Sequence, residues 1–206
     1  MKILKLLIVV TMFTAATVMA HEGEAPPSGP GLFGQPPEYV HVLLNPLPVY
    51  GLSMGLLALA VALFARSRAA KGVGLGIIIL TSAAAWPVLH YGQNGYQNVS
   101  NASDEEGRRW LAEHMERAGK FVYGFYATAL LGIAALVSLK KFPKAANPLA
   151  VITLIAAVTS LGVGAWVSRA GGQIRHPEFR HEPAPVEASS SSGEPQQSET
   201  YQPSRP

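Results

Sequence analysis

The sequence predicts an all-α, polytopic membrane protein: an antiparallel bundle of four transmembrane helices, with helix three extended outside the membrane and disordered tails. Three observations predict this class. Of the 206 residues, 49% are apolar and only 14% are charged, against roughly 25% charged in soluble domains. Four long stretches carry no charged residue, and two of the short segments between them are basic.

The N-terminal segment has the pattern of a secretory signal. Lys2 and Lys5 precede a short apolar run, and small residues stand at the −3 and −1 positions of a cleavage site after Ala20. We therefore expect a signal peptide over 1–20; a retained signal anchor is the alternative. Residues 21–38 are rich in Pro, Gly and Glu, which predicts an external disordered linker.

The four uncharged stretches are each long enough to span a membrane. A helix rises 1.5 Å per residue, so about 20 residues cross the hydrocarbon core. Within a transmembrane domain at 39–182, we predict spans at about 42–65, 72–90, 121–139 and 145–168. Pairs of small residues one turn apart, such as Gly51 and Gly55, favour close packing of these helices.

The charges of the connections predict the orientation. The first connection contains Arg66, Arg68 and Lys71, the third contains Lys140, Lys141 and Lys144, and neither contains an acidic residue. Short basic connections stay on the cytoplasmic side. Both termini and the 91–120 segment are therefore expected outside, in agreement with the signal sequence.

The outer segment is predicted to contain a loop followed by a helix. Residues 91–101 are rich in Gly, Asn and Gln and indicate a loop, whereas 103–106 (SDEE) has the pattern of a capping box. Apolar residues and His114 then recur at helical spacing. One long helix is expected from about 104 to 139, with 104–120 outside the membrane and His114 facing the bundle axis. The segment 183–206 predicts a disordered external tail.

Histidines occur at the outer end of every predicted span. His41 opens the first, His90 closes the second, His114 precedes the third and His176 follows the fourth. Imidazole is the commonest metal ligand and the usual axial ligand of non-covalent haem. The expected site therefore holds haem b or a transition-metal ion. Its predicted metal ligands are His41, His90, His114, His176, Glu116 and Glu178, and the arginines predicted to bind haem propionates are Arg117, Arg169 and Arg175.

A second interpretation of these histidines needs no cofactor. A single histidine at a membrane interface is also an ordinary amphipathic residue, and topology concentrates polar residues at helix ends. Gly171-Gly172 after the fourth span also has two interpretations. The pair either ends the helix so that Arg175, His176 and Glu178 fold over the bundle mouth, or it is a plain helix stop.

Several function classes are excluded or disfavoured. The chain has no Cys, which excludes disulfides, thiolate metal sites and covalent haem attachment. Its net charge of +3 is dispersed, so no nucleic-acid partner is expected. No charged residue lies inside a predicted span, which disfavours a transporter. Two function classes remain. One is a redox or metal-handling protein with a respiratory or periplasmic redox partner, and the other is a non-catalytic accessory subunit without cofactor. In both cases the chain is expected to contact membrane lipids.

Four segments resemble a known group of proteins. HVLLNPLPVYG at 41–51, WPVLHYG at 86–92, EHME at 113–116 and AGGQIRHPE at 170–178 are similar to motifs of the bacterial four-helix inner-membrane proteins of domain-of-unknown-function family 2231. The resemblance covers about residues 40–180 and is carried by His41, Asn45, Pro48, Gly51, His114, Gly171, Gly172 and His176. It implies a bacterial or archaeal inner-membrane protein with histidine motifs at the outward helix ends. It implies no activity.

Overall fold

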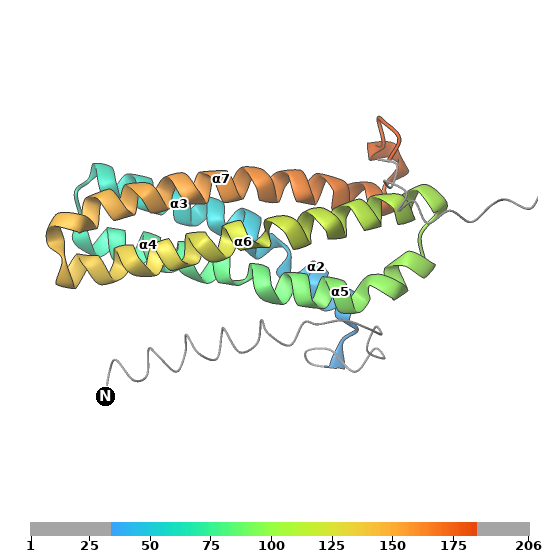
Figure 1. Cartoon of the computed structure of the whole chain (residues 1–206), viewed down its shortest axis with the longest axis horizontal. Coiled ribbons are helices and arrows are strands. Elements are labelled where there is room, and N and C mark those ends of the chain that lie inside the picture. Colours follow the sequence, from blue (N-terminus) through green and yellow to red (C-terminus); the bar gives the residue numbers. More distant parts are fainter. Residues whose placement is uncertain (1–33, 185–206) are drawn as a thin grey trace, which may run out of the picture.

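The computed structural model describes residues 34–184 and confirms the predicted fold class. Within these residues, four long apolar helices pack antiparallel, and each is long enough to cross a membrane (Figure 1). Apolar side chains such as Leu57, Leu130 and Ile155 are exposed on their outer surfaces, as lipid contact requires. The predicted signal peptide, the linker up to residue 33 and the tail from residue 185 lie outside the described residues.

The first span is interrupted by prolines. It consists of α2 (Pro37–Leu44), a π-helical turn η2 (Leu47–Gly51) and α3 (Leu52–Phe64). Pro46 and Pro48 have no N–H to donate to the preceding turn. The chain accommodates them by widening to the π turn, a feature that often marks functional sites.

The second span is longer than predicted. It consists of α4 (Arg68–Ala83) and α5 (Ala85–Asn101). The prediction of a loop over residues 91–101 is wrong, because these residues form the last turns of α5. Tertiary contacts with α2 outweigh their low helix propensity: Asn98 donates to the Glu38 carboxylate at 3.2 Å, and a Cβ on Gly95 would lie 2.8 Å from the Glu38 nitrogen.

The third span is the predicted long helix, α6 (Glu105–Lys141). Its N-cap is Asp104, one residue later than the capping-box pattern suggests. The Asp104 Oδ1 atom accepts the Gly107 N–H at 2.6 Å, while the Ser103 hydroxyl donates to the Val99 carbonyl. A carboxylate at this position also interacts favourably with the positive end of the helix dipole.

The fourth span, α7 (Pro143–Arg175), ends later than the predicted helix end. Gly171 and Gly172 lie inside α7, so they do not end the helix. The chain turns only after Arg175, through the short 3₁₀ turn η3 (Pro177–Phe179). The glycines serve a packing role instead, as the site shows.

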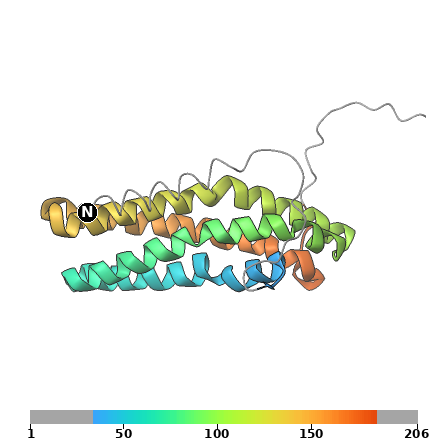
Figure 2. The ribbon, with the colours of Figure 1, turned by 90° about the horizontal axis from the view of Figure 1, so that it is seen from below.

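The bundle has two distinct ends. The α3–α4 and α6–α7 connections lie at one end, with the basic residues in or beside them, and the α5–α6 connection and η3 lie at the other (Figures 1 and 2). The spans pack side by side: α3 contacts α4 and α7, α6 contacts α4, α5 and α7, and α4 also contacts α7. The core between them is formed by small and branched apolar side chains, among them Leu52, Leu59, Leu75, Ile78, Ala150 and Ala157.

The two helical hairpins, α2 to α5 and α6 to α7, share a sequence pattern. In each first helix a histidine is followed, after seven residues, by Val-Tyr-Gly: His41 with 49–51, and His114 with 122–124. In each second helix a valine is followed four residues later by a glycine, at 88 and 92 and at 167 and 171. The hairpins run in the same direction through the bundle, so the chain contains two parallel internal repeats, one for each hairpin.

Candidate functional site

A cavity of about 70 Å³ lies among the four spans, in the half of the bundle that ends at the α5–α6 connection and η3. The two hairpins line it with equivalent positions. In the first helix of each hairpin, the lining residues include the histidine and the residues four, seven and eight positions after it. In the second helix of each hairpin, they include the valine of the repeat and residues near it. The lining residues are His41, Asn45, Pro48, Val49, Ala85, Val88, Leu89, Gly92, His114, Met115, Ala118, Phe121, Val122, Phe125, Gly164, Val167 and Ser168. The cavity is therefore apolar, with few polar groups.

His41 is held against α5. Its Nδ1 atom lies 2.8 Å from the Val88 carbonyl oxygen. One turn later, Gly92 leaves room for the ring, because a Cβ there would lie 2.8 Å from the same Nδ1 atom. A carbonyl oxygen can only accept a hydrogen bond, so Nδ1 carries the proton. The neutral ring then has its lone pair on Nε2.

His114 repeats this arrangement on α7. Its Nδ1 atom lies 3.0 Å from the Val167 carbonyl oxygen, and a Cβ on Gly171 would lie 3.1 Å from the ring. The side chain is only 6% exposed, which confirms that it faces the bundle interior. Here too Nδ1 is the donor, and Nε2 is left with a free lone pair.

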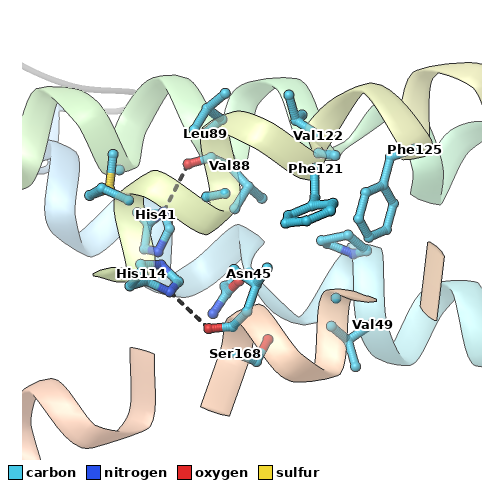
Figure 3. A pocket seen from close by; sticks show the side chains of 17 residues that line it. His41, Asn45, Val49, Val88, Leu89, His114, Phe121, Val122, Phe125 and Ser168 are labelled. Atoms are coloured by element: carbon cyan, nitrogen blue, oxygen red, sulfur yellow. Dashed lines mark hydrogen bonds between the residues drawn. The ribbon is translucent and has the colours of Figure 1, made fainter. Parts of the chain in front are cut away.

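The two rings are direct neighbours. Their centroids are 6.1 Å apart and their planes meet at 84°. Figure 3 shows the rings side by side, with hydrogen bonds running from each to a carbonyl on a different helix. A backbone carbonyl on Nδ1 that fixes the tautomer and orients Nε2 is the usual support of a metal-binding histidine.

The other two histidines of the predicted set do not line the cavity. His90 is exposed, stacks on Trp86 with centroids 5.5 Å apart and contacts Asn94. His176 lies beyond α7, where its Nδ1 is 2.9 Å from the Glu178 carboxylate and its ring stacks on Phe179. The expectation that His176 faces inward is wrong, because α7 continues past the glycines.

The two predicted carboxylate ligands also lie elsewhere. Glu116 is exposed and pairs with Lys120 one turn along α6. Glu178 is exposed beyond the membrane spans. Its pKa lies below the ordinary value because its own backbone N–H and the His176 ring donate to the carboxylate. Within residues 34–184, no three His, Cys, Asp or Glu side chains gather in a metal-binding group.

The three predicted propionate-binding arginines have other partners. Arg117 pairs with Glu113 at 2.5 Å and lies over the Trp166 ring, with its Cζ atom 3.9 Å from the ring centroid. The remaining two, Arg169 and Arg175, bond to the Glu182 carboxylate and the Ala102 carbonyl respectively. None of the three lines the cavity.

The size of the cavity and the geometry of the rings favour a small ligand. Pockets for drug-sized molecules begin near about 300 Å³, so a cavity of about 70 Å³ favours a single ion over a haem. A single ion needs little space: two imidazoles that bind one metal at about 2.0–2.1 Å have centroids about 5.2 Å apart at the tetrahedral angle and about 6.4 Å apart when linear. The observed 6.1 Å separation lies inside this range.

Fold and site together define a class, a multi-pass membrane protein with four spans and a pair of inward-facing histidines at one end. Comparisons with protein-family models, with curated proteins and with solved structures found no match to the chain.

Proposed function

We propose that the protein handles a transition metal at the outer face of a bacterial inner membrane, by binding one ion between Nε2 of His41 and Nε2 of His114. The observation that carries the proposal is the matched support of the two rings. Each ring donates Nδ1–H to a backbone carbonyl of its own hairpin, at 2.8 and 3.0 Å, and packs against a glycine one turn later. Two neutral imidazoles with fixed tautomers are a ready donor pair.

The orientation belongs to the same proposal. The six basic residues in or beside the α3–α4 and α6–α7 connections favour a cytoplasmic position for that end. The histidine pair lies toward the opposite end of the spans, where it can exchange an ion with the periplasm. His41 and His114 are also among the positions that carry the resemblance to family 2231, and we propose kinship with that family on those positions.

Metal binding by the purified full chain tests the proposal. Co²⁺ serves as a visible probe alongside elemental analysis of the protein as isolated. We expect one equivalent of Co²⁺ to bind. His41→Ala and the volume-conserving His114→Phe should weaken binding by more than the roughly 10–100-fold that loss of a supporting hydrogen bond causes.

His90→Ala and His176→Ala are the matched controls, because these histidines are exposed and lie outside the cavity. They should bind Co²⁺ like the wild type. Absence of metal in the isolated protein together with failure to bind Co²⁺, Zn²⁺ or copper would reject the proposal in favour of an accessory subunit without cofactor. Equal losses in all four variants would reject the His41–His114 pair as the site.

A further inference from the structure

We infer that the ion is monovalent copper, held by Nε2 of His41 and His114 with the thioether of Met115 as a third ligand. This inference rests on the proposed function and specifies the chemistry of the same site. Three independent observations support it: the charge of the cavity wall, the separation of the rings, and the presence of a sulfur donor.

The cavity wall supplies no negative charge. None of the residues that line it is an Asp or a Glu. The nearby Glu113 is already paired with Arg117 at 2.5 Å. A divalent ion on two neutral imidazoles would keep its full charge in apolar surroundings. Because the cost of burying an ion rises with the square of its charge, a monovalent ion costs about a quarter as much.

With Nε2 of both rings on one ion, the separation of the rings corresponds to a wide angle at the metal. The centroids are 6.1 Å apart, nearer to the linear limit of about 6.4 Å than to the tetrahedral value of about 5.2 Å. Zinc in protein sites is almost always tetrahedral and takes four ligands. Monovalent copper is satisfied by two or three ligands with an open angle between the nitrogens, which is what this pair offers.

A soft donor lines the same cavity as the pair. Met115 follows His114 on α6, is half-buried and lines the same cavity. Thioether sulfur selects Cu(I) over the harder divalent ions, and imidazole binds copper well. The remaining polar groups of the wall, Asn45 and Ser168, are neutral oxygen and nitrogen groups that add little affinity for a soft ion.

The test is an anaerobic competition for Cu(I) between the full chain in detergent and the chromophoric chelator bicinchoninate, with Ag(I) as a redox-inert analogue. Wild-type protein should take one equivalent of Cu(I) from the chelator. Met115→Leu keeps the size and apolar character of the side chain, so it should fold. It should weaken Cu(I) binding by roughly 10–100-fold and remove the copper–sulfur distance from the X-ray absorption spectrum.

Met54→Leu is the matched control, because Met54 is 60% exposed on α3 and is not part of the cavity wall. It should leave both measurements unchanged. Tighter binding of Co²⁺ or Zn²⁺ than of Cu(I), or a copper–sulfur signal that survives in Met115→Leu, would overturn the inference and leave the proposed function standing. Failure to bind any of these ions would overturn both.

Discussion

Arg180 joins the end of α7 to the start of α6 through Asp104. Its Nη1 and Nη2 atoms lie 2.7 and 3.0 Å from the two carboxylate oxygens of Asp104, the N-cap of α6. The same guanidinium donates to the last carbonyls of α7, at Gln173 and Ile174. One side chain thus satisfies acceptors at two helix ends and links the start of α6 to the end of α7 within the second hairpin.

The ion pair between Arg180 and Asp104 predicts that the stability of the protein falls in acid. The pKa of Asp104 lies below its ordinary value of 3.8, because Arg180 and the Gly107 N–H donate to the carboxylate. The stabilisation is therefore complete above that ordinary value and is lost as pH falls through the lower folded pKa. We expect the thermal unfolding midpoint to stay level from pH 7 to about 5 and to fall below about pH 4.

Asp104→Asn should reduce that fall and lower the midpoint slightly near neutral pH. The effect is small because Asp104 is solvent-exposed. Glu105→Gln is the control, since Glu105 forms only an exposed pair with Arg109 within α6. An acid transition that is the same in Asp104→Asn as in the wild type would show that the Asp104 carboxylate does not stabilise this end of the bundle.

Two equivalent glycines of the repeat should respond differently to alanine. Gly51 and Gly124 end the Val-Tyr-Gly segments of the first and third spans. A Cβ on Gly51 would lie 2.5 Å from the Thr81 methyl, whereas one on Gly124 would lie 3.7 Å from the Ser160 hydroxyl, an ordinary contact. Gly51→Ala should therefore destabilise by about 1–3 kcal/mol through overpacking.

Gly124→Ala should be neutral or stabilising by up to about 1 kcal/mol, because alanine loses less backbone entropy in a helix. Reversible unfolding of the two variants in detergent measures the difference. If Gly124→Ala costs as much as Gly51→Ala, the difference in packing between the two hairpins at this level is not real.

The sequence predicts the fold well because membrane helices obey strong local rules. Uncharged stretches of the right length could hardly become anything else in lipid, and the periodicity around His114 correctly places that ring inside. The 91–101 segment was less predictable, because its helix depends on contacts of Gly95 and Asn98 with Glu38, a residue far away in the sequence.

The composition of the site was only partly predictable. The position of a histidine at a helix end says little about which way its ring points. His90 is two residues after Val88, on the other side of a helix whose Val88, Leu89 and Gly92 line the cavity. The repeated spacing from histidine to Val-Tyr-Gly is the signal that distinguishes His41 and His114, because it occurs after these two histidines alone.

The orientation of the chain can be tested directly. The basic connections predict that reporters fused after Lys71 or Lys141 are cytoplasmic, and that one fused after Ala102 or Pro206 is exported. An enzymatic reporter active only in the periplasm, paired with one active only in the cytoplasm, measures each site. The opposite pattern at Lys71 and Lys141 would place the histidine pair on the cytoplasmic side and remove the periplasmic part of the proposed function.

The glycines behind the two rings should control metal affinity without providing a ligand. A Cβ on Gly171 would lie 3.1 Å from the His114 ring, and one on Gly92 would lie 2.8 Å from the His41 Nδ1 atom. In Gly171→Ala and Gly92→Ala the ring must shift and its hydrogen bond to the carbonyl lengthens. Loss of such support costs roughly 10–100-fold in metal affinity, and we expect that loss in both variants.

Gly162→Ala is the control on the same helix as Gly171, because a Cβ there meets no atom within 4 Å. Titration of the three variants with Co²⁺ or Cu(I), after confirming that each is folded, compares them on one scale. Unchanged affinity in both Gly171→Ala and Gly92→Ala would mean that the orientation of the rings does not matter. The two histidines would then only pack against each other in the bundle. A metal bound through Nε2 depends on the carbonyl that accepts from Nδ1, so its affinity should have changed.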